Sequence, residues 1–381
     1  MNAGPLHRER AFDWLKGLAI LFMIQCHALV LLRPQLKTDR LYRWLDGIDG
    51  LVAPAFLFTA GFSLGLALVR SAKEDNRSAR ARRVLRRILE VLLVATLLNV
   101  LWFPIRSEPQ WLLRIDILHC IGIALLTALP LVAAYAGRPA TLKWLALGVS
   151  VLLFAVSPFA ESVRGPMARL ANTSAGSLFP LLPWAAYVYL GISVGTVAAS
   201  GDRRTLQRWL IGLWILSAGV WQSSPLFLRL YPPHSFWLTD PGNHGQRLAF
   251  LLPFTLLLMQ LEARIPRRLS SALPLRWIEV FGTSSLAAYF FHQVLLFYPI
   301  LGFSFDAWWG KRCDWTGYFV RTSALIAATF FLALATDRIY RWLSWSNGRI
   351  DGQISVPQLP RVLSETTRRT RKRGPGRGAK L

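Results

Sequence analysis

The sequence predicts an all-α protein, a polytopic bundle of about ten transmembrane helices with both termini in the cytoplasm. Apolar residues make up 53% of its 381 residues and charged residues only 17%, whereas a soluble chain carries roughly 25% charged residues. The mean hydropathy is +0.36, and runs of about 20 mostly apolar residues, the length of a membrane-spanning helix, recur along the chain. These observations exclude a disordered chain, a fibrous chain and an ordinary cytosolic enzyme. The runs are too long, and too little alternating, for a closed barrel.

Ten apolar runs mark the predicted spans. They are Trp14–Leu32, Ile48–Val69, Val84–Ile105, Leu112–Tyr135, Leu142–Phe159, Leu178–Ala199, Leu206–Ser223, Leu248–Leu261, Trp277–Leu301 and Gly317–Thr336. No small-residue cleavage site follows the first run, so we expect a retained span rather than a signal peptide. The eighth run is short and contains Pro253, so its helix either begins earlier in the chain or is re-entrant. Because spans must pack on one another, residues 1–346 are predicted to form one membrane domain.

Basic residues predict the orientation of these spans. The chain holds 44 Lys and Arg against 20 Asp and Glu, a net charge of +24, and loops that stay in the cytoplasm are enriched in Lys and Arg. The loop after the second run, RSAKEDNRSARARRVLRR, is strongly basic, and the loops after the fourth, sixth and eighth runs are also basic. Both termini are therefore predicted to be cytoplasmic, with the chain integral to the plasma (inner) membrane. The charge is assigned to topology, so the lipid bilayer is an expected partner and nucleic acid is not.

The end of the chain forms a second predicted segment, residues 347–381. It is rich in Arg, Gly, Pro and Ser, and the stretch RRTRKRGPGRGAK cannot bury a core, so we expect a disordered cytoplasmic tail. The tail acts either as a solvated topology signal or as a tether to anionic lipid headgroups or RNA.

Three histidines inside the apolar runs are the best indicators of function, because ionisable groups in a membrane are costly and usually face the bundle interior. They are His27 in the first run, His119 in the fourth and His292 in the ninth. If the helices are straight, His119 lies about 10 Å below the outer surface and His292 about 22 Å from the inner end of its run. We therefore predict one layer of imidazoles in the outer third of the membrane, around a shared polar cavity. In the alternative interpretation, each ring only bonds to a neighbouring helix.

A neutral imidazole is suited to moving protons near neutral pH, so this layer is the predicted catalytic site. His27 is the preferred base or nucleophile, because Gln25 and Cys26 give it a polar neighbourhood. Asp116, three residues before His119, is expected to hold that ring in one tautomer. Three histidines could also bind zinc, but no HExxH-type spacing is present, and no metal is expected. The histidines outside the apolar runs are weaker candidates: His7, His234 and His244.

Polar residues near the ends of spans are candidates for binding. Asp46 and Asp49, at the outer end of the second span, are predicted to bind sugar hydroxyls, or else to serve as helix caps and turn residues. Trp184 either stacks on a sugar ring or belongs to the interfacial aromatic belt. The sequence contains no phosphate loop or dinucleotide fingerprint. A nucleotide-bearing co-substrate would therefore be held by scattered cations, of which Lys16 and Arg10 are the predicted examples.

Several stretches resemble one family. The first of them is RAFDWLKGLAILFMIQCHA, which resembles the opening segment of the heparan-alpha-glucosaminide N-acetyltransferase-like membrane proteins. In that family, an acidic residue, a basic residue and Gly lie early in the first span, and a His or Asn lies late in it. Here these residues are Asp13, Lys16, Gly17 and His27. Four later stretches resemble later family segments in the same order: LYRWLDGIDGLVAPAFLFTAGFSLG, RIDILHCIGIALL, LFPLLPWAAYVYLGISVG and SSLAAYFFHQVLL. Together they cover most of residues 8–300.

The resemblance implies an integral membrane acyltransferase that moves an acyl group, chiefly acetyl, from cytoplasmic acyl-CoA to a hydroxyl or amine of a sugar or glycan outside. His27 would take the acyl group covalently or deprotonate the acceptor. His119 with Asp116, and His292, would orient the acceptor or stabilise the oxyanion.

The chain departs from the family pattern at two places. The spacing of Lys16 and His27 is similar to the basic-x10-His motif of the acyltransferase-3 group, with Lys in place of the usual Arg. The eukaryotic glycosaminoglycan enzymes use an Asn in the first span and a histidine in the loop that follows. This chain has His27 at the first position and no histidine between Leu29 and Asp49.

Two other functions remain open from the sequence. A transporter or flippase would use the His and Asp layer as a proton relay or substrate site, although the chain has no clear inverted repeat. A structural partner in an envelope complex would use the histidines only as bonds between helices. A homodimer is compatible with the acyltransferase and with both of these alternatives.

Overall fold

The structure is a computed structural model that describes residues 9–73, 77–101, 109–265, 273–299 and 302–347. Within these ranges all regular elements are helical, apart from an isolated bridge between Leu32 and Cys313, which confirms the predicted all-α class. The chain divides into two compact units, Met1–Leu334 and Ala335–Leu381. The predicted boundary at 346/347 remains a prediction, and the basic tail lies outside the described residues from 348 onward.

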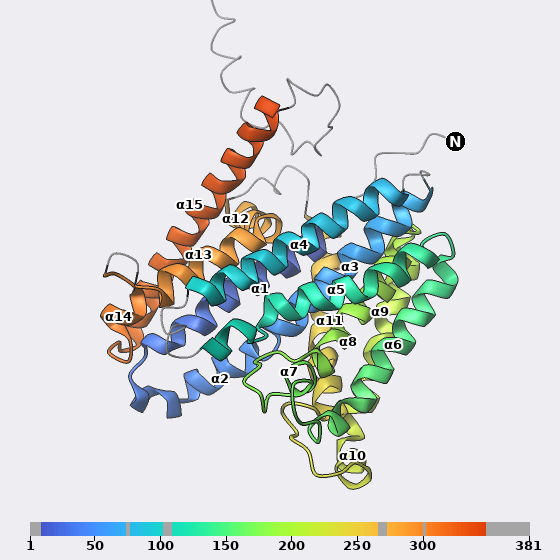
Figure 1. The fold of residues 1–381 in the computed structure, drawn as a ribbon, viewed down its shortest axis with the longest axis horizontal. Helices are drawn as coiled ribbons and strands as arrows, with labels where there is room; N and C mark the ends of the chain where they lie inside the picture. Colours follow the sequence, from blue (N-terminus) through green and yellow to red (C-terminus); the bar gives the residue numbers. More distant parts are fainter. Residues whose placement is uncertain (1–8, 74–76, 102–108, 266–272, 300–301, 348–381) are drawn as a thin grey trace, which may run out of the picture. The chain divides into compact units, whose positions relative to one another are not determined.

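Figure 1 follows the helices along the chain. Their bounds are α1 Arg10–Ala28, η1 Leu29–Leu31, η2 Pro34–Thr38, α2 Arg40–Asp49, α3 Val52–Lys73, α4 Arg77–Leu101, η4 Pro109–Leu113, α5 Ile117–Tyr135, α6 Pro139–Ala160, α7 Ala168–Ala171, α8 Leu181–Ala198, α9 Arg203–Gln222, α10 Ser224–Leu230, α11 Pro241–Arg264, α12 Leu273–Thr283, α13 Ser285–Phe297, α14 Phe305–Trp309 and α15 Trp315–Asn347.

Within the described residues, each of the ten apolar runs overlaps one of these helices or a pair of them; residues 102–105 of the third run and 300–301 of the ninth lie outside the described residues. Among the described residues, six helical segments are long and apolar enough to cross a membrane: Arg10–Leu31, Arg40–Ala72, Ile117–Tyr135, Pro139–Ala160, Leu181–Ala198 and Trp315–Ile339. The bent pairs α9–α10 and α12–α13 raise the number to eight. The third and eighth runs correspond to α4 and α11, whose polar ends lower their average hydropathy. The total of ten spans and the cytoplasmic termini remain predictions.

A glycine seam joins α3 and α8, which pack closely against each other. Both helices carry glycines four residues apart: Gly61 and Gly65 on α3, Gly191 and Gly195 on α8. A Cβ atom at Gly61 would collide with the backbone carbonyl of Val188. Small residues at this spacing allow two membrane helices to approach backbone to backbone. The seam therefore fixes the position of α3 against α8. The opposite face of α3 lines both cavities described below.

The ninth predicted span is not one straight helix. It divides at Ser284 into α12 and α13, which meet at an angle of 91°. The sequence Gly-Thr-Ser-Ser at the break explains the bend, because Ser and Thr side chains compete for backbone hydrogen bonds and Gly is a weak helix former. Gly282 also packs tightly against the backbone of Asp13 on α1. The depth of about 22 Å that we expected for His292 assumed a straight helix, so that estimate was wrong.

Other helix boundaries differ from the sequence prediction. The fourth span begins at Ile117 rather than Leu112, because Asp116 caps α5 by accepting the backbone N–H of His119. The eighth span begins at Pro241, seven residues before the predicted start, with Asp240 as its N-cap. The earlier start, one of the two alternatives for this run, is therefore the one observed.

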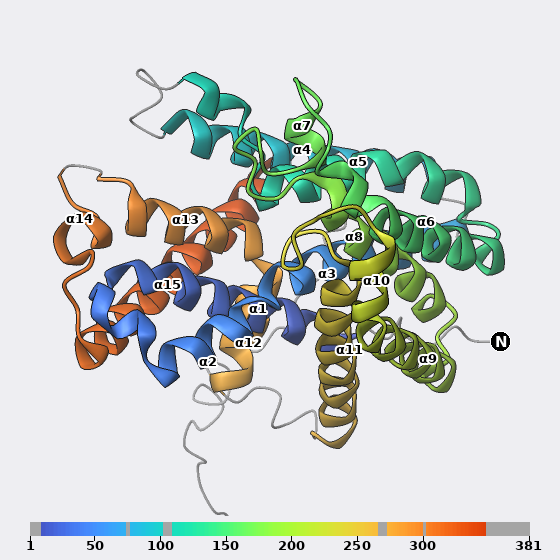
Figure 2. The same cartoon turned by 90° about the horizontal axis from the view of Figure 1, so that it is seen from below.

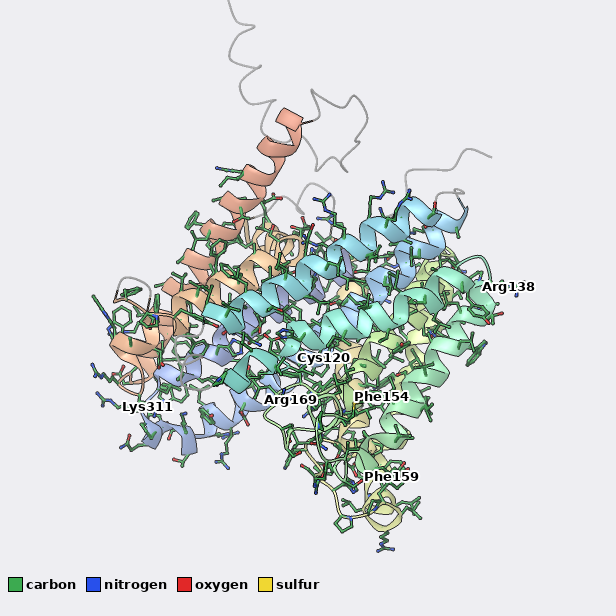
Figure 3. All side chains as sticks on the ribbon, in the orientation of Figure 1. Cys120, Arg138, Phe154, Phe159, Arg169 and Lys311 are labelled. Atoms are coloured by element: carbon green, nitrogen blue, oxygen red, sulfur yellow. The ribbon has the colours of Figure 1, made fainter. Side chains whose placement is uncertain are left out.

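Loops expected on opposite sides of the membrane lie at opposite ends of the helices. Figure 3 shows Arg138, in the turn between α5 and α6, at one end, and Lys311 and Arg169 toward the other. In Figures 1 and 2, α1 runs between α3 on one side and α12 and α13 on the other, in agreement with its packing contacts. This central place of α1 is what brings its polar residues against several other helices.

Candidate active site

A cavity of about 400 Å³ lies where α1, α3, α5 and α13 approach each other. His27 and Cys26 of α1 and Gln293 and Tyr289 of α13 contribute polar side chains to its lining. We name it the histidine cavity. Because it is large enough for a small ligand and contains a titratable ring, it is the candidate site for chemistry.

His27 and His292 meet edge to edge in this region. Nδ1 of His27 lies 2.9 Å from Nε2 of His292, and the two ring planes differ by only 8°. His292 is fully buried, and its Nδ1 lies 2.9 Å from the carbonyl oxygen of Ala288. The side-chain amide of Gln293 lies 2.9 Å from Nδ1 of His27. Two of the three predicted histidines thus form one hydrogen-bonded pair, and His27 is the member that lines the cavity.

The segment before α5 forms another wall of the histidine cavity. Arg114 and Asp116 both line it. The amide of Asn99 donates to the carbonyl of Arg114 at 3.0 Å, and the carbonyl of Ile115 accepts the backbone N–H of Leu178 at 3.0 Å. These bonds hold the wall against α4 and against the chain before α8.

Asp116 and His119 form the pair that the sequence predicts. Oδ1 of Asp116 lies 2.8 Å from Nδ1 of His119 and also accepts the backbone N–H of His119 at 2.9 Å. An N-cap aspartate and a histidine three residues later face each other across the first helical turn. Among the described residues that line the histidine cavity, Asp116 is present and His119 is not. The pair therefore reaches the cavity through its carboxylate.

Asp49 contributes a carboxylate from the end of α2. It lines the histidine cavity, and both of its oxygens are buried. The thiol of Cys26 and the side-chain amide of Gln25 are hydrogen-bonding neighbours of this carboxylate, and Asp46 is a neighbouring like charge. Asp49 is the last residue of α2, so it does not cap a helix N-terminus. Asp46, one turn earlier, is exposed and does not line this cavity.

A second cavity, of about 370 Å³, is lined by four cationic and two acidic side chains and therefore carries a formal charge of +2. The cations are Lys16, Arg70, Arg80 and Arg83, and the acids are Glu9 and Asp13. We name it the basic cavity. An excess of positive charge around a concave site favours phosphate groups.

The two cavities share α1 and α3 as walls. On α3, Phe56 lines the histidine cavity, and Thr59, one turn further, lines the basic cavity. On α1, Met23 and His27 line the first and Lys16 the second. At 1.5 Å per residue, Lys16 and His27 are about 16 Å apart along the helix axis. The α1–α3 interface thus carries both cavities along one line.

Besides Asp46, two more of the predicted binding residues lie outside both cavity linings. The guanidinium of Arg10 pairs with Glu279 and stacks on the ring of Trp14. Trp184 is buried, packs against Phe179 and Tyr187, and has the guanidinium of Arg247 over its ring at 5.2 Å. Trp184 therefore lies in an aromatic cluster inside the protein.

His234 and His244, two of the weaker candidates in the sequence analysis, both have defined hydrogen-bond partners. His244 is fully buried in α11, with Nδ1 2.7 Å from the hydroxyl of Tyr187 and Nε2 3.1 Å from the carbonyl of Leu238. In the segment before α11, Nε2 of His234 lies 2.8 Å from Oδ2 of the buried Asp240. These hydrogen bonds indicate that both histidines stabilise the fold.

The environment of His234 favours its charged form. Burial disfavours the imidazolium, but hydrogen bonds to Asp240 and to the carbonyl of Pro232, with the nearby charges of Asp240 and Glu161, outweigh it and raise the pKa of His234. Since both ring nitrogens face acceptors, the ring donates two hydrogen bonds when protonated.

The sequence prediction missed several cavity residues: Asn99, Arg114, Tyr289, Gln293 and Tyr298. Gln293 is adjacent to His292, and Arg114 is two residues before Asp116, so proximity to a predicted site residue is the signal that could have found these two. Across the described ranges, no group of three or more His, Cys, Asp or Glu side chains is arranged to hold a metal ion.

Comparison with known families gives one match. The sequence model described as heparan-alpha-glucosaminide N-acetyltransferase, catalytic, matches residues 8–222, more than half of the chain. The matched region contains His27, Asp49 and the Asp116–His119 pair, together with every residue that lines the basic cavity. Among curated proteins, none matches the chain.

Proposed function

Because the chain belongs to the heparan-alpha-glucosaminide N-acetyltransferase catalytic family, we propose that it is an integral membrane acyltransferase. It takes an acyl group, chiefly acetyl, from acyl-CoA bound at the basic cavity. It transfers this group to a hydroxyl or amine of an extracytoplasmic sugar or glycan bound at the histidine cavity. The observation that carries the proposal is the placement of a histidine cavity and a basic cavity along the same α1–α3 interface.

The basic cavity suits the phosphates of coenzyme A. Arg70, Arg80 and Arg83 offer planar groups that can bind phosphate oxygens two at a time, and Lys16 adds a compact charge. The loop that carries several of these residues is the one predicted to be cytoplasmic, the side where acyl-CoA is available.

The separation of the cavities suits the shape of the donor. Coenzyme A carries its thioester at the end of a long flexible arm, away from its phosphates. A path of about 16 Å along α1 would place the thioester near His27 while the phosphates remain at the basic cavity. The acyl group would then meet an acceptor that enters from the opposite side.

His27 supplies the reactive nitrogen in this scheme. As a general base it accepts the proton of the acceptor hydroxyl or amine, while the acceptor oxygen or nitrogen attacks the thioester carbonyl carbon. The carbon–sulfur bond then breaks and the thiolate leaves, later taking up the proton. In the covalent route, His27 itself attacks the carbonyl carbon, the carbon–sulfur bond breaks and the thiolate leaves. The acceptor then attacks the acyl group on the ring, the carbon–nitrogen bond breaks, and the acceptor's proton passes to the released ring nitrogen. Both routes need an unprotonated ring nitrogen that faces the cavity.

The other cavity residues have matching roles. The buried carboxylate oxygens of Asp49 accept hydrogen bonds from the acceptor, as the carboxylate of Asp116 can also do. Arg114 and Tyr289 supply donors for the negative charge that develops on the carbonyl oxygen. Neither role requires a metal ion.

Labelled acetyl-CoA tests the function. Sealed membranes that contain the wild-type protein should transfer label to a glycan fraction. His27→Ala should abolish this transfer at unchanged protein level, and His234→Gln, at a histidine outside both cavities, should retain it. Label that stays on the protein without acceptor supports the covalent route. Accumulation of substrate in vesicles without modification would instead identify a transporter, and transfer by His27→Ala would remove the role of His27.

A further inference from the structure

We propose that His292 is a positioning residue that fixes the tautomer of His27, with a hydrogen on Nδ1 of His27 and a bare Nε2. The proposal concerns hydrogen positions and can be tested without activity; its effect on turnover rests on the proposed function. His292 does not itself line the histidine cavity, whereas His27 does.

The hydrogen on His292 is set by the backbone of its own helix. Its Nδ1 lies 2.9 Å from the carbonyl oxygen of Ala288, and a carbonyl oxygen can only accept. Nδ1 of His292 therefore carries a hydrogen. A second hydrogen on Nε2 would make a fully buried imidazolium, and within the described ranges no carboxylate forms an ion pair with it. Burying an unpaired charge is strongly unfavourable, so His292 is neutral and its Nε2 has a lone pair available to accept a hydrogen bond.

The lone pair of His292 determines where His27 carries its hydrogen. Nδ1 of His27 lies 2.9 Å from that Nε2 in a nearly coplanar arrangement. Two bare nitrogens at this distance would repel each other. A hydrogen on Nδ1 of His27 converts the contact into a hydrogen bond of ordinary length. A neutral imidazole has one hydrogen, so Nε2 of His27 is left without one.

Gln293 is compatible with this assignment. Its amide lies 2.9 Å from Nδ1 of His27 and 3.2 Å from Nε2 of His292. The amide oxygen and nitrogen can exchange places by a flip. With the oxygen toward His27, the amide accepts from the N–H at Nδ1. With the nitrogen toward His27, an amide hydrogen would meet that same N–H, so the assigned tautomer goes together with the oxygen-inward orientation of Gln293.

The tautomer of His27 determines whether the ring presents a lone pair or a hydrogen to the histidine cavity. Without a partner at Nδ1, the hydrogen of a neutral His27 could move to Nε2, and the ring would present a donor to the cavity instead of a lone pair. His292 prevents this, as partners behind metal-bound histidines do. Removal of such a partner typically costs about 10–100-fold in activity.

Nitrogen-15 spectra of the histidine rings in the full-length protein test the proposal. We expect His27 to show a protonated Nδ1 and a bare Nε2. His119, bonded to Asp116 through Nδ1, should show the same pattern, and His244, bonded to the carbonyl of Leu238 through Nε2, the opposite one. These two rings are internal references. A protonated Nε2 on His27 in the wild-type protein would overturn the proposal.

A matched pair of variants separates positioning from packing. His292→Phe keeps a ring and removes the acceptor, so Nε2–H should become the major form of His27. His292→Gln places an amide oxygen near the position of the original Nε2, so His27 should retain its wild-type signals. Transfer of label should fall about 10–100-fold in the first variant and recover most of its rate in the second. Unchanged His27 signals in His292→Phe would contradict the proposal. If the expected spectra appear but the wild type transfers no label, the proposed function fails and the positioning role stands.

Discussion

The basic cavity gives a quantitative prediction, because one helix offers a matched pair of arginines. Arg83 and Arg86 lie three residues apart on α4, and both are exposed. Arg83 lines the basic cavity, whereas Arg86 does not and forms an ion pair with Glu90. If the cavity binds the phosphates of acyl-CoA, Arg83→Gln should weaken donor binding, and Arg86→Gln, which removes the same charge, should have little effect.

The size of the effect follows from the exposure of Arg83. A charge pair about 6 Å apart in a medium of dielectric about 20 interacts by about 3 kcal/mol, and solvent screening at an exposed side chain reduces this to about 1 kcal/mol. That corresponds to about a fivefold increase in KM for acetyl-CoA. The kcat should be unchanged, since the basic cavity lies about 16 Å from His27 along α1.

The assay is the initial rate of acetyl transfer as a function of acetyl-CoA concentration, at low and at high salt. The difference between Arg83→Gln and wild type should shrink at high salt, because screening weakens the contact in both. An equal rise of KM in both variants would show a general effect of surface charge. A fall of kcat in Arg83→Gln with no change in KM would refute the placement of the donor at this cavity.

Three further predictions concern packing, pH and the acceptor. Gly61→Ala should lower the free energy of unfolding by about 1–3 kcal/mol through overpacking at the α3–α8 seam. Gly148→Ala should raise it by about 0.5–1 kcal/mol, because a Cβ atom at Gly148 would have no atom of another element within 4 Å. Thermal unfolding in detergent measures both variants, and equal stabilities would contradict the close packing at the seam. Because the pKa of His234 is raised, its ion pair with Asp240 stabilises the folded protein fully below about pH 6.5, and this stabilisation is lost as the pH rises through the folded-state pKa. The melting temperatures of wild type and His234→Gln should therefore converge at alkaline pH. A constant difference between the two melting temperatures would disprove this pH dependence. Asp49→Asn should raise the KM for the acceptor and leave the KM for acetyl-CoA unchanged; the reverse pattern would exclude Asp49 from the acceptor site.

The all-α fold class and the approximate positions of the long helices followed from hydropathy, because about 20 apolar residues in succession have few alternatives to a membrane helix. The bend at Ser284 did not follow, since it depends on the close approach of Gly282 to α1 as well as on local propensity. The N-cap at Asp116 was within reach, because an aspartate before an apolar run is a common helix start. The early start of α11 was one of two alternatives, and Asp240 at its N-cap decided between them.

The candidate site was predictable in part for a similar reason. His27 and His292 are 265 residues apart in sequence, and their depth in the bundle suggested a shared cavity. Their direct contact depends on the rotation of α13 about its axis, which sequence periodicity does not determine. Arg114 lies in a segment without regular periodicity that is held by Asn99 and Leu178, so its direction is a property of the tertiary structure. His244 seemed peripheral because the apolar run began after it, yet α11 carries it into the core.

The position of bound acetyl-CoA in an electron cryomicroscopy map of the full-length protein tests whether the two cavities bind one donor. We expect phosphate density between Lys16 and Arg83, with the arm of the coenzyme following α1 and α3 and the thioester beside Nε2 of His27. Phosphate density at any other surface, or a thioester remote from His27, would contradict this expectation.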